Sequence, residues 1–437
     1  MMMTAWLVLV FIGAGADGAQ APARAITLEE AIASGLANSH RLAELQARKE
    51  AADAAEAGRA AASLPVVALL VGYARTNHVQ EFGIVSPGQP IRLLYPDLPD
   101  NYHARIDLNW PVYSGGRNDA LERAAAAEGQ AAGEDLEAAR ADLRLEITRA
   151  FWAIVTARET EHVLAQSIDS VDAHVRDLRT RLQQGLIPPN EVLTAEAQQA
   201  RQRVAAIEAH NTRAIAEADL KRLMGSDDPE PLEPAAAFDL IPAAPAAAAE
   251  LEAQARARRP ERRALVERAA ASRAREDAVH AGARPQVGIA AGFDYANPNP
   301  HIFPRRGIWQ DSWDVSANVS WLLWDGGRRR ADEAEAAASS RAIDARLGEI
   351  DRQITFEVRQ RWLEVDSNRA AIDAAAAGVQ SATEARRVVG ERYRAGVATS
   401  TDVLDAELDV LQAELDLARA HANTQLALAR LDRAAGK

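Results

Sequence analysis

Two long helical patterns constrain the fold of this chain more than any other feature of its sequence. They extend from about Arg117 to Gln183 and from about Arg328 to Arg394, and each covers close to 67 residues. At 1.5 Å per residue, such a helix is roughly 100 Å long. A helix of this length cannot fold back into a compact domain, so we expect it to pack along other long helices.

Apolar residues indicate how these helices pack. They recur at alternating spacings of four and three, which predicts a coiled-coil seam, and many neighbouring alanines permit close approach. The two predicted seams are Leu164, Ile168, Val171, Val175, Leu178 and Leu182 in the first half, and Leu404, Leu408, Leu411, Leu415, Ala418 and Ala422 in the second.

Each long pattern ends in the same kind of turn. Gly185 ends the first and Gly396 ends the second, and a new helical pattern begins a few residues later, at Ser400 or Thr401 in the second turn. Glycine is typical just after a helix, and Ser, Thr or Asp is typical where one begins. The two glycines lie 211 positions apart, so one helix–turn–helix tip occurs twice.

The duplication extends along most of the chain. At the same offset of 211, Trp110 corresponds to Trp321, whereas upstream the offset is 220, so that Gly72 corresponds to Gly292. Each copy has the order helix, strand, loop, strand, long helix, tip, helix. We therefore expect an internal two-fold repeat with four parts: a signal peptide at 1–25, a first repeat at 26–225, a Pro/Ala-rich connector at 226–246 and a second repeat at 247–434.

Four segments alternate apolar and polar residues with the period of a β-strand. The clearest extends from Trp313 to Trp324, and the others lie near residues 67–73, 104–112 and 287–293. Runs of about ten such residues with aromatics near their ends are typical of membrane β-barrel strands, apolar towards lipid and polar towards a wet lumen. An antiparallel sheet on a soluble core alternates in the same way, so the strands alone leave both open.

The N-terminus favours export. Thr4–Ala16 is an apolar run too short to span a membrane, and small residues follow it, which is typical of a secretory signal, although the usual basic residues are missing. The absence of cysteine excludes disulfides, thiolate metal sites and a lipid-modified N-terminal cysteine. A net charge of −13 argues against binding to nucleic acid.

No pattern indicates catalysis. Residues 13–18 match G-x-G-x-x-G but follow no strand and lie in the signal segment, and the nine histidines are scattered. We therefore expect no enzymatic activity, no cofactor and no metal site.

Four barrel-type strands cannot close by themselves, because the smallest barrels have about eight. Unpaired strand edges are not tolerated in lipid, so several copies would have to share one sheet. The expected fold class is a mixed α and β membrane protein in which each chain contributes four strands to a trimeric 12-stranded β-barrel. That barrel would continue into a long α-helical coiled-coil barrel.

The chain resembles the TolC-type outer-membrane efflux protein family, also termed outer membrane factors. The resemblance rests on the repeat, on strand pairs ending in Trp-x-x-Tyr/Trp-x-Gly-Gly-Arg, and above all on the tip from Arg392 to Ala406 with its Asp-Val-Leu-Asp-Ala sequence. It implies a homotrimeric channel in the Gram-negative outer membrane that extends into the periplasm. Such a channel is the passive exit duct of a tripartite efflux pump or a type I secretion system.

The resemblance also implies a periplasmic adaptor (membrane fusion) protein as partner and, through it, an inner-membrane transporter. The cargo cannot be read from these residues. The alternative is a soluble periplasmic coiled-coil scaffold or adaptor, which would share the signal and the heptads. Such a scaffold would not need four amphipathic strands in two matched pairs.

The resemblance implies that Asp402 and Asp405 line the periplasmic entrance. They share one helix face because they are three residues apart, and Asp409 extends the acidic stripe. In three copies these carboxylates would favour cations at a narrow mouth. The structural alternative is a solvated charged helix face.

Other residues at the turns are candidates for docking or for backbone geometry. Candidates for adaptor contact are Arg181, Leu182, Gly185, Arg392 and Gly396, although Gly and Arg are also expected where helices end. The expected sharp strand-to-helix turns are at Gly115, Gly116, Gly326 and Gly327. Pro188 and Pro189 in the first tip depart from the family pattern, so we expect that tip to contribute docking rather than selectivity.

Overall fold

A computed structural model describes residues 24–88, 90–236 and 245–437. The predicted signal peptide therefore lies outside the described residues except for Arg24 and Ala25. The chain divides into two units. The tip unit contains the described residues up to Ser39 together with Ala141–Ala247 and Gln360–Arg433, and the sheet unit contains His40–Arg140, Ala248–Arg359 and Ala434–Lys437.

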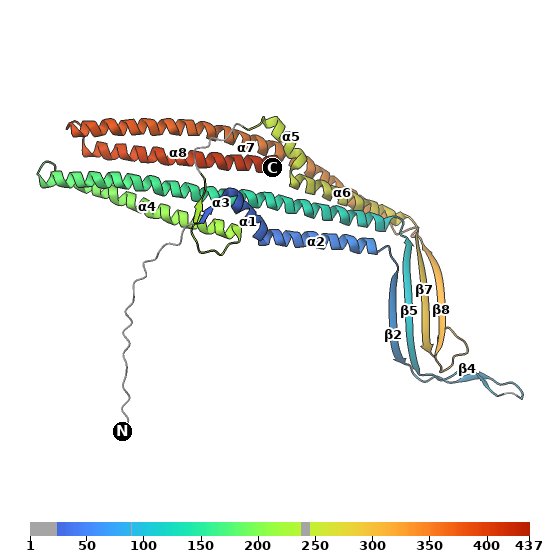
Figure 1. Ribbon diagram of the computed structural model, residues 1–437. Coiled ribbons are helices and arrows are strands. Elements are labelled where there is room, and N and C mark those ends of the chain that lie inside the picture. Colours follow the sequence, from blue (N-terminus) through green and yellow to red (C-terminus); the bar gives the residue numbers. More distant parts are fainter. Residues whose placement is uncertain (1–23, 89, 237–244) are drawn as a thin grey trace, which may run out of the picture. The chain divides into compact units, whose positions relative to one another are not determined.

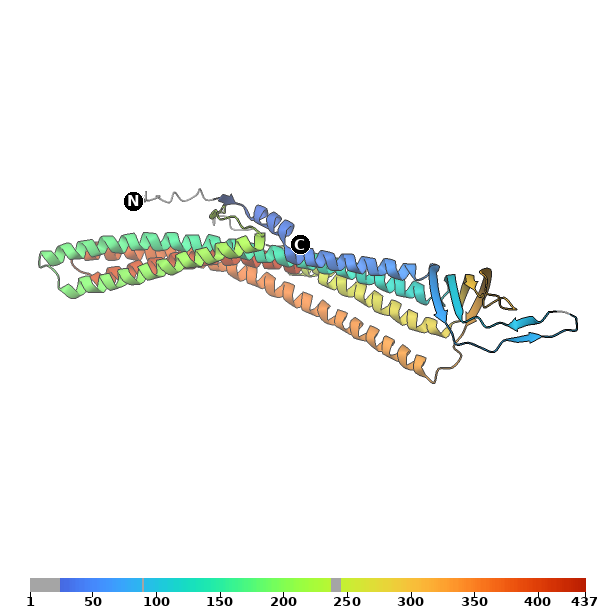
Figure 2. The same cartoon turned by 90° about the horizontal axis from the view of Figure 1, so that it is seen from below.

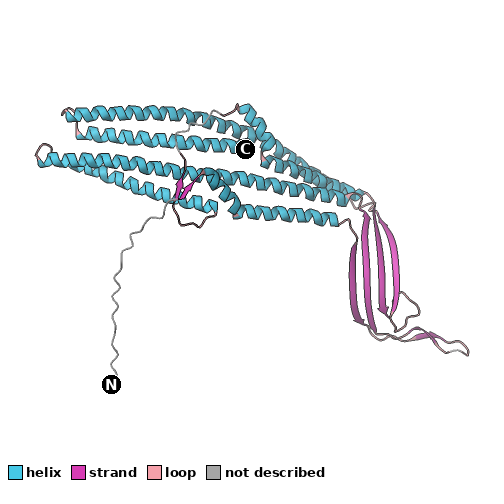
Figure 3. Cartoon of the chain, in the orientation of Figure 1, coloured by secondary structure: helices cyan, strands magenta, loops and turns pink. Residues whose placement is uncertain are grey.

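The sheet unit contains one four-stranded antiparallel sheet (Figure 3), and its strand order is β2-β5-β7-β8 (labelled in Figure 1). Its strands are β2 (Val66–Arg75), β5 (Asp100–Tyr113), β7 (Gln286–Asn297) and β8 (Gln310–Ser320). All four predicted strands are confirmed. The predicted C-terminal end of the last one, at Trp324, is wrong, because β8 ends at Ser320, opposite the first residue of β7.

The register separates an apolar face from a polar face. One row crosses all four strands through Leu69, Ile106, Phe293 and Trp313, and these side chains are 68%, 47%, 45% and 73% exposed. The neighbouring row on the opposite face contains Arg105 and Asp294. Among the described residues of the sheet unit, no helix covers the apolar face, unlike the buried face of a soluble antiparallel sheet (Figure 1).

Long helices continue from the strands. Helix α3 (Arg117–Gln183) and helix α7 (Arg328–Arg394) each have 67 residues and confirm the predicted bounds. Four glycines with positive φ precede them, where the chain turns from strand to helix: Gly115, Gly116, Gly326 and Gly327. These backbone angles favour glycine because it lacks a Cβ.

The two halves use the same hydrogen bond to hold the strand ends. The Trp110 indole N–H donates to the Ser63 carbonyl, and the Trp321 indole N–H donates to the Ala283 carbonyl, at 3.2 and 3.0 Å. The tryptophans are related by the offset of 211 and the carbonyls by the offset of 220. The same contact therefore recurs although the loop between the strands differs in length.

The helix before each strand pair is divided in two, whereas one helix was predicted. The first pair is α1 (Leu28–Asn38) and α2 (His40–Ala61), and the second is α5 (Ala248–Arg258) and α6 (Pro260–His280). The backbone becomes extended at Ser39 and at Arg259. Proline at position 260 explains the second break, because the residue before proline avoids helical angles.

Strands of three or four residues form two further pairs. In the tip unit, β1 (Arg24–Ile26) pairs in parallel with β6 (Leu232–Pro234), which lies in the predicted connector. In the sheet unit, β3 (Phe82–Ile84) and β4 (Arg92–Tyr95) form a hairpin between β2 and β5. Residues 237–244 of the connector lie outside the described residues.

The tip unit contains two helical hairpins (Figure 2). Helix α3 turns into α4 (Pro189–Met224), and α7 turns into α8 (Ser400–Ala435). Val171, Val175, Leu178 and Leu404 of the predicted seams are at most 4% exposed. Among the described residues, no helix is both long enough and apolar enough to cross a membrane.

Candidate functional site

The two helix tips share one backbone design. Gly185 and Gly396 have φ of 71° and 75°. The amide of Gly185 donates to the Leu182 carbonyl, and the next amide, of Leu186, donates to Arg181. Gly396 and Val397 make the same two bonds to Tyr393 and Arg392. These paired bonds are a Schellman motif, so all five proposed docking residues belong to helix C-termini: Arg181, Leu182, Gly185, Arg392 and Gly396.

The two helices that follow these turns begin differently. Helix α8 begins with a capping box in which the Thr399 hydroxyl accepts from the Asp402 amide, at 3.2 Å. The Asp402 carboxylate accepts from the Thr399 amide, at 2.7 Å. Helix α4 begins after Pro188 without any side-chain cap. The sequence predicted that α8 begins at Ser400 or Thr401, and it begins at Ser400. The residue that caps the helix is Thr399, one position earlier.

Asp402 therefore caps its own helix. The pKa of its carboxyl is lowered mainly by the hydrogen bond from the Thr399 amide, so the group is charged at neutral pH. Asp405 and Asp409 are also exposed. Within the described part of the chain, neither of these two carboxylates accepts a hydrogen bond or forms an ion pair, so their charges are available to solvent and to ions.

Four residues connect the first hairpin to the second, and sequence reasoning missed two of them, His174 and Tyr393. His174 on α3 shares a hydrogen bond of 2.9 Å with the Ser400 hydroxyl on α8. The ring of His174 also meets the ring of Tyr393 on α7 edge-on, at 5.5 Å between centres. The guanidinium of Arg181 lies 4.7 Å from the centre of the Tyr393 ring, in cation–π geometry.

This connection is largely withdrawn from solvent. Ser400 is 3% exposed, and burial lowers the pKa of His174, so its imidazole is neutral at pH 7. Burial also raises the pKa of Tyr393. The buried Tyr393 hydroxyl has no hydrogen-bond partner among the described residues. Arg181 thus contacts the second tip, which reduces the part of its side chain that a docking protein could reach.

Apolar packing also joins the two hairpins, next to the contacts of His174 and Tyr393. Leu404 of the second hairpin packs into a cluster built mostly from the first, and Leu182 lies against it. The buried members are Val171, Val175, Leu178, Val192, Ala195 and Leu404. The leucine seams were predicted from their spacing. His174 could not be found in this way, because a single histidine on a long helix has no periodic signal.

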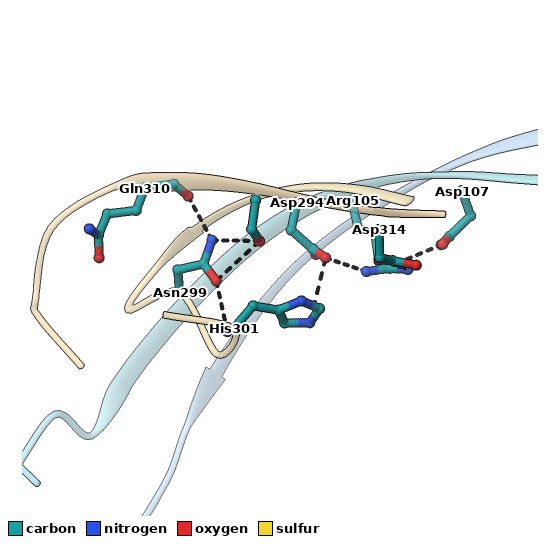
Figure 4. Close-up of polar contacts among 8 residues, drawn as sticks. Arg105, Asp107, Asp294, Asn299, His301, Gln310 and Asp314 are labelled. Carbon is teal, nitrogen blue, oxygen red and sulfur yellow. Dashed lines mark hydrogen bonds and ion pairs between the residues drawn. The ribbon is translucent and has the colours of Figure 1, made fainter. Parts of the chain in front are cut away.

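A second polar cluster lies on the polar face of the sheet (Figure 4). The Arg105 guanidinium binds Asp107 at 2.7 Å and Asp314 at 3.1 Å, and it also binds Asp294, whose side chain is 8% exposed. This arrangement satisfies three carboxylates from three strands with one guanidinium. These ion pairs connect β5, β7 and β8 in addition to the backbone hydrogen bonds between the strands.

The loop between β7 and β8 folds over this cluster. Asn299 is fully buried and donates to the Gln310 carbonyl and to the Ser312 hydroxyl, at 3.0 Å each. It also accepts from the amide of His301, which places that residue near Asp294 (Figure 4). The loop therefore covers part of the polar face of the sheet (Figure 4).

Ligand atoms of Asp294, His301 and Asp314 lie within 4.8 Å of one another. Such a group could in principle hold a metal ion, but Arg105 already binds both carboxylates. A cation would have to displace the guanidinium and would be repelled by it. The residues do not fit a metal site.

Comparison with known proteins supplies independent information. A family model described as "Outer membrane efflux protein" matches residues 31–226 and 251–437. Protein CyaE of Bordetella pertussis is 28% identical over 307 residues, which cover 69% of this chain. The chain spans 64% of the length of that relative.

Solved structures share the fold. A membrane protein from Pseudomonas aeruginosa has a TM-score of 0.79 and 23% identity, covering 94% of this chain and 92% of its own. The CmeC outer membrane channel of Campylobacter jejuni has a TM-score of 0.79 and 17% identity, covering 94% of this chain and 85% of its own.

Proposed function

The chain belongs to the outer membrane efflux protein family, and on this premise we propose that it is a homotrimeric channel-tunnel. It serves as the outer-membrane exit duct of a tripartite efflux pump or a type I secretion system. The family consists of passive channels and not of enzymes, in agreement with the expectation of no enzymatic activity. The cargo is selected elsewhere in such an assembly, by the inner-membrane transporter and its adaptor.

The exposed apolar face of the sheet carries this proposal. A row of large apolar side chains crosses all four strands and faces away from the protein. In water such a face would have to be covered, whereas in a bilayer it contacts lipid. A soluble scaffold would not need an exposed apolar face on its sheet, and the scaffold alternative is therefore not favoured.

The edges of the sheet support the trimer. In the part of the chain that the structure describes, strands β2 and β8 each have one partner strand and one free edge. In lipid, unpaired backbone groups are strongly unfavourable, so β8 of one copy pairs with β2 of the next. Three copies close a barrel of twelve strands, with the polar face and its Arg105 cluster lining the lumen.

The tips support docking to a periplasmic adaptor. Leu186 and Val397, each just after the tip glycine, are 68% and 63% exposed. They are related by the offset of 211, so each protomer presents two similar apolar contacts at the tips of its hairpins. Together with Gly185 and Gly396 they form the surface that an adaptor would contact.

The domain organisation follows from the same proposal. Residues 1–25 form the signal peptide, residues 26–225 and 247–434 form the two repeats, and residues 226–246 connect them. Asp405 and Asp409 contribute to an acidic mouth, and Asp402 adds charge while it caps α8. The protein is thereby located in the outer membrane and extends into the periplasm.

Fractionation tests the proposal. We expect the protein in the outer-membrane fraction, as a trimer in detergent that dissociates on heating. In planar bilayers the trimer should form cation-selective channels. A soluble periplasmic monomer without channel activity would contradict the proposal and favour the scaffold.

Charge replacement tests the mouth. Asp405→Ala combined with Asp409→Ala should weaken cation selectivity, because it removes six exposed carboxylates per trimer. Asp416→Ala is the matched control on α8, since this carboxylate is already bound to Gln412 and Arg419. Equal selectivity in both variants would show that the stripe does not line the constriction.

A further inference from the structure

A cavity of about 750 Å³ lies in the sheet unit where β7 and β8 meet helices α3, α6 and α7. It is lined by side chains from all five of these elements. The basic members, which define what is termed here the arginine pocket, are Arg117, Arg275, Arg284, Arg328 and Arg329.

The arginine pocket is basic within an acidic protein. Five arginines face only two acidic residues in its lining, Asp325 and Asp332, although the whole chain has a net charge of −13. The Asp325 carboxylate is already engaged, because it accepts hydrogen bonds from the amides of Gly327 and Arg329. Three of the five arginines form ion pairs: Arg275 with Glu128 at 3.0 Å, Arg328 with Asp332 at 3.6 Å and Arg329 with Glu333 at 3.7 Å. Among the described residues, Arg117 and Arg284 have no acidic partner, so the uncompensated positive charge is theirs.

Several guanidinium N–H groups in the pocket are available to a ligand. Among the described residues, the Arg117 side chain has no acidic partner, and that of Arg284 donates to the Gly115 carbonyl at 3.0 Å. Arg328 forms only a 3.6 Å ion pair with Asp332, and its side chain is 84% exposed. Each guanidinium has five N–H donors, so these contacts leave most of them free.

The pocket opens on the polar face of the sheet. Gln286 and Ser320 line it and form a cross-strand pair. Counting by twos along β7 and β8, they lie on the same side as Asp294 and Asp314. In the proposed channel this side faces the lumen, at the level where strands give way to helices.

A smaller cavity of about 260 Å³ continues the basic surface. It shares Leu121 and Arg275 with the arginine pocket and reaches Arg59 on α2. Arg275 pairs with Glu128 there, at 3.0 Å. Arg59 has no acidic partner in the described part of the chain. The basic surface thus extends from α2 to α7.

We propose that the arginine pocket binds multivalent oxyanions, that is, solutes carrying phosphate or carboxylate groups, as they pass through the lumen. The planar guanidinium matches both groups in two-pronged geometry. The positive ends of the α3 and α7 dipoles lie at the same place, since both helices begin in the pocket. The inference rests on the proposed function for its lumenal position.

The contrast with the acidic tips gives this site a physical role. Cations concentrate at an acidic mouth, whereas anionic solutes that have passed it would be held at the basic level before the barrel. Three copies of the pocket around one lumen would strengthen the field for a multivalent anion more than for a monovalent one.

Isothermal titration of the full-length trimer in detergent tests this binding. Inorganic pyrophosphate represents phosphates and citrate represents carboxylates. We expect saturable binding that weakens about tenfold in Arg117→Gln/Arg328→Gln, the change expected from losing hydrogen bonds to charged groups. Arg341→Gln/Arg346→Gln is the matched control, because these exposed arginines of α7 lie outside the pocket and carry the same charge.

The variants are compared as folded trimers of equal helicity. If the double variant does not fold, Arg328→Gln alone replaces it, because this side chain is largely exposed. Binding of only one of the two anions supports the proposal and identifies the group recognised. Absence of saturable binding to the wild type, or equal weakening in the control, overturns it.

Calorimetry separates this inference from the proposed function. If the protein binds pyrophosphate but forms no channel, the proposed anion site is supported and the proposed channel function is contradicted. If it conducts ions but binds neither anion, the channel function is supported and the anion site is contradicted. In bilayers, pyrophosphate should block the wild-type current more strongly than that of the pocket variant.

Discussion

The two helix tips have the same backbone but different side-chain chemistry. Both end in a Schellman motif at a glycine with positive φ. The first then begins its next helix with proline and no capping side chain, whereas the second uses the capping box of Thr399 and Asp402. The two copies thus share the turn, and they differ in the residues that begin the next helix and in the contact of the second tip with His174.

The largest difference concerns two leucines related by the offset of 211. Leu404 is 4% exposed inside the cluster between the hairpins, whereas Leu193 is 64% exposed. Leu404→Ala should lower the free energy of unfolding by about 2–5 kcal/mol through loss of burial and the cavity left behind. Leu193→Ala should change it little within one protomer.

Urea titration at a fixed protein concentration measures both variants. If Leu193→Ala proves as destabilising as Leu404→Ala, Leu193 is buried between copies, and the effect should then depend on protein concentration.

The second comparison concerns the helix starts. Thr399→Ala should destabilise the protein by about 1 kcal/mol, because the Asp402 amide loses its acceptor. Pro188→Ala, at the equivalent position of the first tip, removes no side-chain hydrogen bond and should cost less. Thermal unfolding of the two variants, followed by circular dichroism, distinguishes them. Equal losses would mean that the two starts are stabilised alike.

The third comparison concerns the equivalent arginines. Arg181→Met should cost about 0.5–1 kcal/mol through loss of the cation–π contact with Tyr393. Arg392→Met should cost less, because among the described residues the Arg392 side chain has no aromatic partner and its hydrogen bond to the Val397 carbonyl is long, at 3.4 Å. The difference between their melting temperatures is the measurement, and a reversed order would contradict the assignment of Arg181 to the link between the tips.

The smallest expected effect is on pH dependence. Burial lowers the pKa of His174 in the folded protein, so the unfolded chain binds its proton at higher pH. The contribution of His174 to the free energy of unfolding is therefore complete above the pKa of the unfolded chain, about 6.5, and it decreases as the pH falls below that value. His174→Gln should reduce the change in the free energy of unfolding between pH 7.5 and 5.5, which is measured by urea titration at each pH. An unchanged slope would exclude His174 as the titrating group.

Particular residues show how far the sequence predicts the fold. The bounds of α3 and α7 followed from glycines at their ends and from patterns free of proline. The four strands followed from their period of two. The end of β8 and the breaks at Ser39 and Arg259 did not, because they depend on where a partner strand begins and on where the chain changes direction.

The sequence by itself determined the repeat, the long helices, the paired strands and the family, because these depend on local period and on spacing along the chain. Only the tertiary structure brought His174 to Ser400, 226 residues away, and gathered five arginines from α3, α6, α7 and the segment before β7 into one pocket. The physical reason is that a hydrogen bond or a local charge depends on distance in space. The second tip illustrates both: its turn was readable in the sequence, but the role of Asp402 as a helix cap was visible only in the fold.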